Sequence, residues 1–188
     1  MTTATQQIEQ GAGLAAGTWV LDPAHSTIGF VSRHMMVAKV RGRFGEFEAA
    51  IHVEDDLDRS WAEASIVAAS LDTGNEQRDG HLKSPDFLDV ERFPRLTFRS
   101  TSVEHVDGPR WRIRGDLAIR DITLPVELDA ELNGTDVNPW GREVAFFSAA
   151  GEFDREDYGM VWNQALESGG VLVGKKVQLE IEGEAIRQ

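Results

Sequence analysis

Apolar and polar residues alternate one by one along most of the chain, and this period of two is typical of a β-strand with one buried face. The alternation is clearest at 111–119, where Trp111, Ile113 and Leu117 alternate with arginine and aspartate. Similar stretches predict strands near Trp19 and over 27–34, 40–53, 61–71, 96–103, 122–132, 144–153 and 176–182. The pattern therefore predicts an all-β protein.

Most of the predicted strands are joined by short polar turns. Asp107-Gly108 and Asn133-Gly134 are dipeptides typical of β-hairpins. About eight strands with one polar face each favour an antiparallel sheet that curls and closes, because a closed barrel leaves no strand edge exposed. We predict a single barrel domain over 18–188, preceded by a flexible N-terminal tail over 1–17.

The side chains expected to face inward are a mixture of large and small. The aromatic ones are Phe30, Phe47, Phe98, Trp111 and Phe146, and the small ones are Ala49, Ala64, Ala68, Gly115, Ala130 and Ser148. Large and small side chains can interlock into a solid core. Alternatively, the small residues leave a long apolar channel, since an eight-stranded barrel is wide enough to hold one small ligand. The pattern leaves both alternatives open.

The stretch 71–98 does not alternate, and we interpret it as a helical insert, at about 74–92, over one end of the barrel. Thr73 and Glu76 have the spacing of a capping box, which predicts a helical turn after them. Ser84-Pro85-Asp86 predicts a second helical start. Phe93-Pro94 ends the insert, because the residue before a proline favours extended backbone.

Composition and charge exclude or disfavour several classes of function. The 188 residues include no cysteine and carry a formal net charge of −13. Disulfides, thiolate metal sites and a cysteine nucleophile are excluded, and binding to nucleic acid or anionic membrane surfaces is disfavoured. The N-terminus lacks the basic and apolar regions of a signal peptide, and no segment approaches the ~20 apolar residues of a membrane span. We expect a cytoplasmic protein.

Two groups of residues have the chemistry of enzyme or metal sites. Asp22, His25 and Ser26 are the residue types of a hydrolytic triad, but no nucleophile elbow is present, and a turn role is favoured. His25, His34 and His81 lack the spacing of a metal motif, so hydrogen-bonded histidines are favoured. We therefore predict no catalytic residue, no metal and no cofactor.

Several motifs, in this order, resemble the YceI-like, polyisoprenoid-binding family over about residues 18–186. They include Trp19-Val-Leu-Asp22-Pro23-Ala-His25-Ser26, Arg78-Asp79-Gly-His81-Leu82, Phe93-Pro94 and Thr97-Phe98. The resemblance implies a lipocalin-like extended antiparallel eight-stranded β-barrel, commonly dimeric, that holds a prenyl chain, with quinone-type or other isoprenoid ligands. Many relatives are exported with a signal peptide, and a usual Gly-Val-Thr-Lys-Pro segment reads Asp121-Ile-Thr-Leu-Pro125 here.

Our hypothesis is a non-catalytic protein that carries or sequesters a long-chain isoprenoid lipid of the polyprenyl or quinone type. Arg78, Asp79 and His81 are the candidates for choosing the head group, although the arginine and aspartate alternatively fix the insert to the rim. An enzyme that uses these three residues on a hydrophobic substrate at the barrel mouth is the second hypothesis. The predicted ligand-binding residues are Ile28, Phe30, His34, Phe47, Ala49, Arg78, Asp79, His81, Phe87, Phe98, Trp111, Ile113, Leu117 and Phe146.

Overall fold

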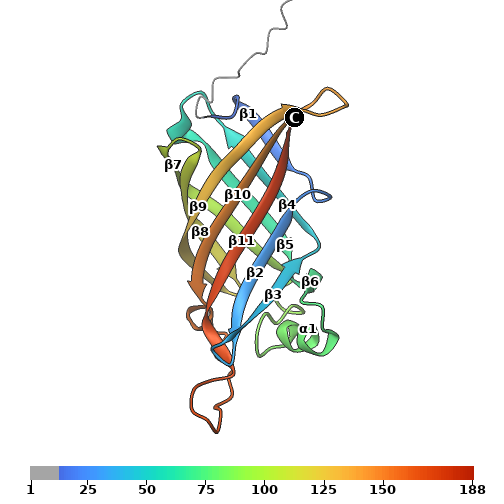
Figure 1. Ribbon diagram of the computed structural model, residues 1–188, viewed down its shortest axis with the longest axis vertical. Coiled ribbons are helices and arrows are strands. Elements are labelled where there is room, and N and C mark those ends of the chain that lie inside the picture. Colours follow the sequence, from blue (N-terminus) through green and yellow to red (C-terminus); the bar gives the residue numbers. More distant parts are fainter. Residues whose placement is uncertain (1–12) are drawn as a thin grey trace, which may run out of the picture.

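The computed structural model describes residues 13–188 and consists mainly of antiparallel strands (Figure 1). The strands are β1 (Gly17–Leu21), β2 (Thr27–His34), β3 (Ala38–Phe44), β4 (Phe47–Val53), β5 (Trp61–Val67), β6 (Leu71–Asp72), β7 (Arg95–Asp107), β8 (Arg110–Ile119), β9 (Ile122–Val137), β10 (Glu143–Asp154) and β11 (Val173–Arg187). The helix α1 spans Glu76–Lys83, and short 3-10 turns occur at Leu57–Arg59, Ala68–Ser70 and Arg155–Tyr158. The described residues contain no helix that is long and apolar enough to cross a membrane.

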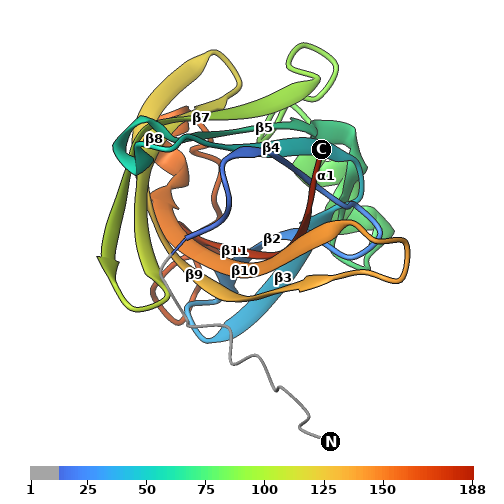
Figure 2. The ribbon, with the colours of Figure 1, turned by 90° about the horizontal axis from the view of Figure 1, so that it is seen from above.

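Eight strands form a closed barrel, which confirms the predicted fold class (Figure 2). Their order is β1-β4-β5-β7-β8-β9-β10-β11, and a second pairing between β1 and β11 closes the ring. The long strand β11 pairs with β1 through residues 185–187 and with β2 through residues 173–182. Two strands thus share one long partner along the barrel wall.

The remaining strands extend the wall beside α1. β3 pairs with β2, and β6 pairs with β3. The strand predicted over 40–53 is therefore two strands, because it breaks at Gly45 and Glu46, whose amides donate to the backbone oxygen and the hydroxyl of Ser70. β3 and α1 lie at the end of the barrel opposite the C-terminus (Figure 1). We call this end the cavity end and the opposite one the packed end.

The insert contains one helix instead of the two predicted helical starts. Asn75, not Thr73, is the N-cap of α1, and its side chain accepts from the backbone amide of Arg78. Thr73 instead contacts Asp79, which accepts from both its amide and its hydroxyl. Ser84 ends the helix, because its amide donates to the carbonyl of His81, and only turns follow before β7.

A row of arginines on the outer face of β8 lies beside a row of acidic residues on β9. Arg112 lies opposite Asp129 and Arg114 opposite Glu127. The guanidinium Nε of Arg114 lies 2.8 Å from a carboxylate oxygen of Glu127. These charges are exposed, so each pair stabilises the fold only modestly.

Two details of the β9–β10 hairpin differ from prediction. The turn lies at residues 138–142 and not at Asn133-Gly134, which stays inside β9. The pairing shifts between Phe146 and Phe147, whose partners are Gly134 and Leu132, so Asn133 is the extra residue of a bulge in β9. Along β10, Ala145, Phe147 and Ala149 pack against the core, so Phe146 lies on the other face, where it is 40% exposed.

The packed end is filled by side chains. Trp19 is 2% exposed, and Ala145 and Ala185 are completely buried. A Cβ atom on Gly183 would lie 2.4 Å from the Phe147 ring, so this glycine makes room for an aromatic side chain above it. Of the predicted N-terminal tail, residues 1–12 lie outside the described part, and Leu14 packs against the core.

Candidate functional site

The cavity end encloses an apolar cavity of about 690 Å³. This volume lies within the ~300–1,000 Å³ range typical of small-molecule sites. The walls come from the inward faces of the strands, and α1 with the residues after it forms one side. The apolar lining includes Ile28, Phe30, Phe44, Ala64, Ile66, Leu71, Leu82, Phe87, Leu96, Phe98, Leu117, Ile119, Val126, Leu128, Phe153, Met160, Trp162, Leu172, Val177, Leu179 and Ile181.

Residues in the cavity wall face inward without being fully buried. Phe30, Ala64 and Leu179 point into the barrel and still keep intermediate exposure. Trp19 also faces inward, at the packed end, and is only 2% exposed. Inward-facing apolar side chains that keep exposed surface show that this half of the barrel is hollow.

An aromatic cluster lies at the mouth of the cavity, where α1 meets the loop between β10 and β11. The ring of His81 lies edge-on to Trp162, with ring centres 4.4 Å apart, and edge-on to Phe87 at 5.0 Å. The Nε2 atom of His81 lies 2.8 Å from a carboxylate oxygen of Asp86. The carboxylate fixes the orientation of the imidazole. The mouth therefore combines aromatic rings with an oriented polar group.

Arg78 and Asp79 converge on Thr73 instead of pairing with each other. The guanidinium of Arg78 donates to the Thr73 hydroxyl at 2.8 Å and to its carbonyl at 2.9 Å. Asp79 accepts from the same hydroxyl at 2.5 Å. Arg78 also lines the cavity, whereas Asp79 does not. These contacts fasten α1 to the end of β6.

A buried arginine forms part of the cavity wall. Arg155 is 2% exposed and donates hydrogen bonds to the carbonyls of Gly174, Met160 and Val173. Burial lowers the pKa of its guanidinium, and no carboxylate forms an ion pair with it among residues 13–188. The buried hydroxyl of Ser32, which also lines the cavity, has no hydrogen-bond partner in the described structure. The wall thus presents polar groups that a ligand oxygen can meet.

The sequence matches the YceI-like domain family over residues 19–185. The chain belongs to the YceI-like family. The UPF0312 protein of Staphylococcus aureus strain COL is 40% identical over 168 residues, which cover 88% of this chain and 95% of that protein. The family inferred from the sequence motifs is therefore confirmed.

Solved structures share the fold of this YceI-like chain. The YCEI protein of Campylobacter jejuni is 26% identical, with a TM-score of 0.71 over 83% of this chain and 90% of that one. Burkholderia cenocepacia BcnA is 19% identical, with a TM-score of 0.76 over 87% and 98% of the two chains. A polyisoprenoid binding domain from Saccharophagus degradans, implicated in plant cell wall breakdown, is 14% identical, with a TM-score of 0.64 over 93% and 100%. The last two similarities establish the fold alone.

The YceI-like barrel brings part of the predicted binding set together. The predicted residues that line the cavity are Ile28, Phe30, His34, Arg78, His81, Phe87, Phe98 and Leu117. Phe47 and Ala49 face inward but lie outside the lining, in contact with the packed core. On β5, Ile66 lies opposite Phe47 and Ala64 lies opposite Ala49, so the two residues lie beside the cavity wall without lining it.

Three other predicted residues also lie away from the YceI-like cavity. Phe146 faces outward because its neighbours Ala145 and Phe147 occupy the inward face of β10. Trp111 and Ile113 lie on the part of β8 opposite residues 103–105 of β7, beyond the last pairing of β7 with β5 at Arg99. There the barrel wall has no neighbouring strand on that side, and so these side chains do not reach the cavity.

Several lining residues of the YceI-like cavity are absent from the predicted set. Leu128, Leu179 and Ile181 occupy the same alternating positions that identify the inward face, so the alternation alone could have found them. Arg155 and Trp162 lie outside the regular part of the strands. No periodic pattern marks them, and only the folded chain places them in the wall.

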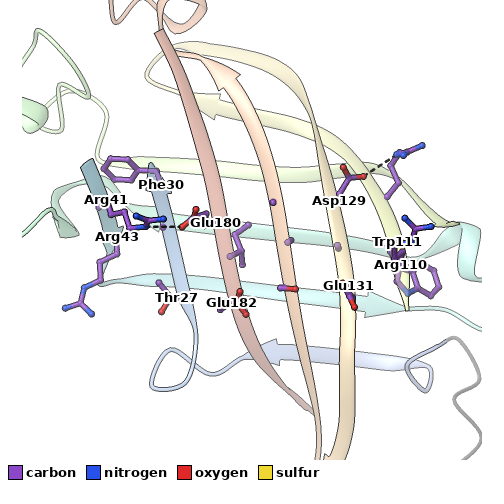
Figure 3. Close-up of a pocket in the computed structure, with 18 of the residues that line it drawn as sticks. Thr27, Phe30, Arg41, Arg43, Arg110, Trp111, Asp129, Glu131, Glu180 and Glu182 are labelled. Carbon is purple, nitrogen blue, oxygen red and sulfur yellow. Dashed lines mark ion pairs between the residues drawn. The ribbon is translucent and has the colours of Figure 1, made fainter. Parts of the chain in front are cut away.

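A second hollow, of about 990 Å³, lies on the outer surface of the YceI-like barrel and is charged (Figure 3). Glu180 and Glu182 alternate along β11 with the inward-facing Leu179 and Ile181, so they point away from the apolar cavity. Arg41 lies 3.7 Å from Glu180 across this surface. Its exposed ion pairs make it unsuited to an apolar ligand.

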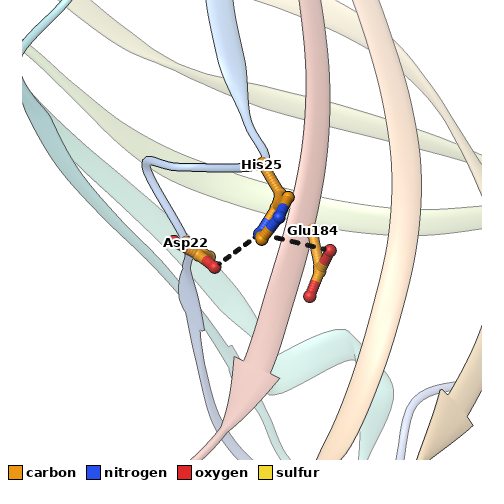
Figure 4. A group of neighbouring side chains, drawn as sticks. All are labelled: Asp22, His25 and Glu184. Atoms are coloured by element: carbon orange, nitrogen blue, oxygen red, sulfur yellow. Dashed lines mark hydrogen bonds and ion pairs between the residues drawn. The ribbon is translucent and has the colours of Figure 1, made fainter. Parts of the chain in front are cut away.

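The Asp22 and His25 motif forms a small cluster with Glu184 at the corner between β1 and β2 (Figure 4). His25 Nδ1 lies 2.8 Å from Asp22 and 3.8 Å from Glu184. The hydrogen bond between His25 and Asp22 lowers the pKa of Asp22 and raises the pKa of His25. Ser26 bonds instead to the backbone of Glu184, so the three residues of the sequence motif do not form a catalytic triad. The cluster fastens this corner of the YceI-like barrel to β11.

Proposed function

We propose that the chain binds a long-chain isoprenoid lipid, of the polyprenyl or quinone type, in the apolar cavity and carries or sequesters it without chemical change. The observation that carries this proposal is the hollow half of the barrel, whose inward-facing wall is apolar and incompletely buried. Family membership supports a binding barrel. The related fold of the Saccharophagus degradans polyisoprenoid binding domain is consistent with the same use.

Burial of the ligand's prenyl chain supplies a free energy comparable to the cost of association. Each buried CH₂-sized group contributes ~0.8 kcal/mol, so three or four prenyl units contribute on the order of 12–16 kcal/mol. Association costs about 4–15 kcal/mol in lost translational and rotational freedom. Tail burial alone therefore offsets most or all of the cost, and affinity rises with tail length until the cavity is full.

Polar groups in the cavity wall can form hydrogen bonds with a ligand head group. Arg155 and Ser32 present a buried cation and a hydroxyl that lacks a partner. An oxygen acceptor, such as a quinone carbonyl or a phosphate, meets both requirements, whereas a pure hydrocarbon leaves them unmet. His81 adds a polar group at the mouth. We therefore expect an isoprenoid with an oxygen-bearing head to bind more tightly than the corresponding alkene.

An enzyme that acts at the cavity mouth is the second candidate. The short contact between His81 and Asp86 favours it, because a carboxylate-oriented imidazole can accept or donate a proton. Against it, Asp79 is engaged with Thr73, and Arg78 shares that contact. Of the three predicted acid–base residues, only His81 is thus available for proton transfer.

The test is to purify the protein, extract it with organic solvent and identify the extract by mass spectrometry, then measure uptake of added polyprenol and quinone. Ala64→Phe places a ring in the cavity and is expected to lower uptake by about tenfold or more, since it displaces ligand volume. Ala150→Phe is the matched control, because Ala150 faces the outer hollow. It is expected to leave uptake unchanged.

The outcomes separate the candidates. Isoprenoid in the extract, together with loss of uptake only in Ala64→Phe, supports carriage in the cavity. An extract without lipid, from protein that also takes up neither ligand, contradicts the proposal. Conversion of a bound lipid that is lost in His81→Ala favours the enzyme instead.

A further inference from the structure

The turn between β2 and β3 has an unexpected sequence for its geometry. Residues 35–37 connect β2 to β3, and within this connection the amide of Val37 donates to the carbonyl of His34 at 3.1 Å, which closes a tight β-turn. Met35 and Met36 hold the two central positions with φ values of 50° and 61°. Such a turn favours asparagine and glycine, because other residues are strained at positive φ. The two methionines here oppose the conformational preference of the backbone.

The side chains at this turn are apolar and exposed. Met35 is 47% exposed, Met36 53% and Val37 79%. Single exposed apolar residues are ordinary on protein surfaces, but a run of three at the tip of a hairpin is not. The strain and the exposure therefore point to a contact made outside the chain.

The turn lies beside the mouth of the apolar cavity. The amide of Met35 donates to the carbonyl of Leu172 at 2.8 Å, and both His34 and Leu172 line the cavity. Val161, which is 64% exposed, belongs to the same loop between β10 and β11. Its neighbour Trp162 belongs to the cavity wall. Exposed apolar side chains thus adjoin the opening of the cavity.

The charge of the segment that forms the turn is opposite to that of the whole protein. The chain contains 32 acidic residues, yet none occurs over residues 23–45. Arg33 and Lys39 flank the turn, both are exposed, and neither forms an ion pair within the described structure. Salt screens charges beyond about 8–10 Å, so a surface that approaches the tip meets these cations and not the net charge of −13.

We propose that the β2–β3 turn, residues 33–39, docks the cavity mouth onto an anionic lipid bilayer. The apolar tip enters the boundary between head groups and acyl chains, while Arg33 and Lys39 lie among the anionic head groups. The overall negative charge repels the other faces and so orients the barrel with its mouth on the membrane. The proposal rests on the proposed function only in that it takes the ligand to reside in a membrane.

The test is sedimentation of the purified protein with vesicles of phosphatidylcholine and phosphatidylglycerol, and with vesicles of phosphatidylcholine alone. The double variant Met35→Asn/Met36→Gly keeps the turn and removes its apolar tip. We expect it to be at least as stable as the natural chain and to bind mixed vesicles about tenfold less, or weaker still. Lys39→Gln is expected to reduce the preference of the protein for mixed vesicles over vesicles of phosphatidylcholine alone.

The control variant is Trp140→Ser. Trp140 is 82% exposed, on the turn between β9 and β10 at the packed end, and its loss is expected to leave vesicle binding unchanged (Figure 1). Equal binding of the natural chain and the double variant overturns the proposal, as does absence of binding to mixed vesicles. A change from dimer to monomer in the double variant, without vesicle binding, overturns it in favour of contact with a second copy.

Vesicle binding and lipid uptake are measured separately, so the two proposals fail separately. Met35 and Met36 lie outside the cavity lining, and the double variant is expected to accept polyprenol supplied in detergent as well as the natural chain does. Extraction of polyprenol from vesicles is expected to be slower. Vesicle binding without any polyprenol uptake leaves the docking inference standing and contradicts the proposed function.

Discussion

The two ends of the barrel are built from the same alternating strands, yet one is solid and the other is hollow. At the packed end Trp19 fills the interior, and Ala145 and Ala185 are completely buried around it. At the cavity end the wall residues Phe98 and Leu179 face inward with part of their surface uncovered. The difference teaches that strand alternation specifies which side chains face inward but not whether they meet.

The position of β1 explains much of the difference. β1 pairs with the last part of β11 and carries Trp19 into the barrel, whereas β2 pairs with the earlier part of β11 and carries Phe30. Phe30 lies over Gly42, where a Cβ atom would be only 2.3 Å from its ring. The ring therefore lies against the wall instead of filling the centre. The Phe98 ring packs onto Gly115 in the same way, so these two rings leave the centre of the cavity open.

The largest expected effect comes from truncating the packed end. Trp19→Ala is expected to lower the free energy of unfolding by about 3–5 kcal/mol, because it leaves a void among buried side chains. Leu179→Ala, at the cavity end, is expected to cost only about 1–2 kcal/mol, since its cavity side already lacks neighbours. Chemical denaturation measures both. Equal costs at the two ends would contradict the distinction between them.

Arg155→Met is expected to have the next largest effect. Its guanidinium holds three backbone carbonyls in the loop between β10 and β11, and the substitution leaves them without these donors. We expect a loss of about 2–4 kcal/mol in the free energy of unfolding. Competition between a polyprenol and the corresponding polyprenyl phosphate provides the second measurement. If Arg155 meets the head group, the variant loses its preference for the phosphate, and an unchanged preference argues for a structural role alone.

Thr73→Val tests how the insert is held over the cavity end. The valine cannot accept from Arg78 or donate to Asp79, and we expect a loss of about 1–3 kcal/mol, concentrated in the insert. Hydrogen exchange over residues 74–92 measures this loss. Thr123→Val, on the exposed face of β9, is the matched control. The role assigned to Thr73 would be contradicted if hydrogen exchange over residues 74–92 became faster in the control variant, or if it did not become faster in Thr73→Val.

The smallest effect is expected from His25→Gln, and it depends on pH. The folded-state pKa of His25 is raised above 6.5, so its stabilising contribution is present below that pH and is lost as pH rises through the raised value. The folded-state pKa of Asp22 is lowered below 3.8, so its contribution is lost as pH falls through that value. The difference in Tm between the natural chain and the variant is thus greatest between about pH 4 and pH 6.5. A difference that does not change with pH would show that the contact is not electrostatic.

The sequence predicts most of the fold because its signals are local. Period-two alternation and Asp107-Gly108 are sufficient for β7, β8 and β9, including their exposed charge pairs. The errors occur where contacts between side chains or strands decide. Which of Phe146 and Phe147 faces inward depends on how β10 packs in the barrel, since both are apolar. The cap at Asn75 depends on Asp79 engaging Thr73.

The candidate site is less predictable than the fold. Phe30, Phe98 and Leu117 were predicted in the lining because they share the inward face with the rest of their strands. The pattern leaves open whether Gly115 leaves space or lies under a large side chain, and in the structure a Cβ atom there would lie 2.5 Å from the Phe98 ring, so the ring covers it. Whether a small residue leaves a void depends on the side chain across from it, which no single strand reveals.

The most direct test of the central claim is an isotope-filtered NMR measurement on the protein loaded with isotope-labelled polyprenol. We predict contacts between the ligand and the methyl groups of Leu117, Leu128 and Leu179, at the cavity end, and none with Leu21, at the packed end. Contacts with Leu21, or with Ala150 in the outer hollow, would contradict the account.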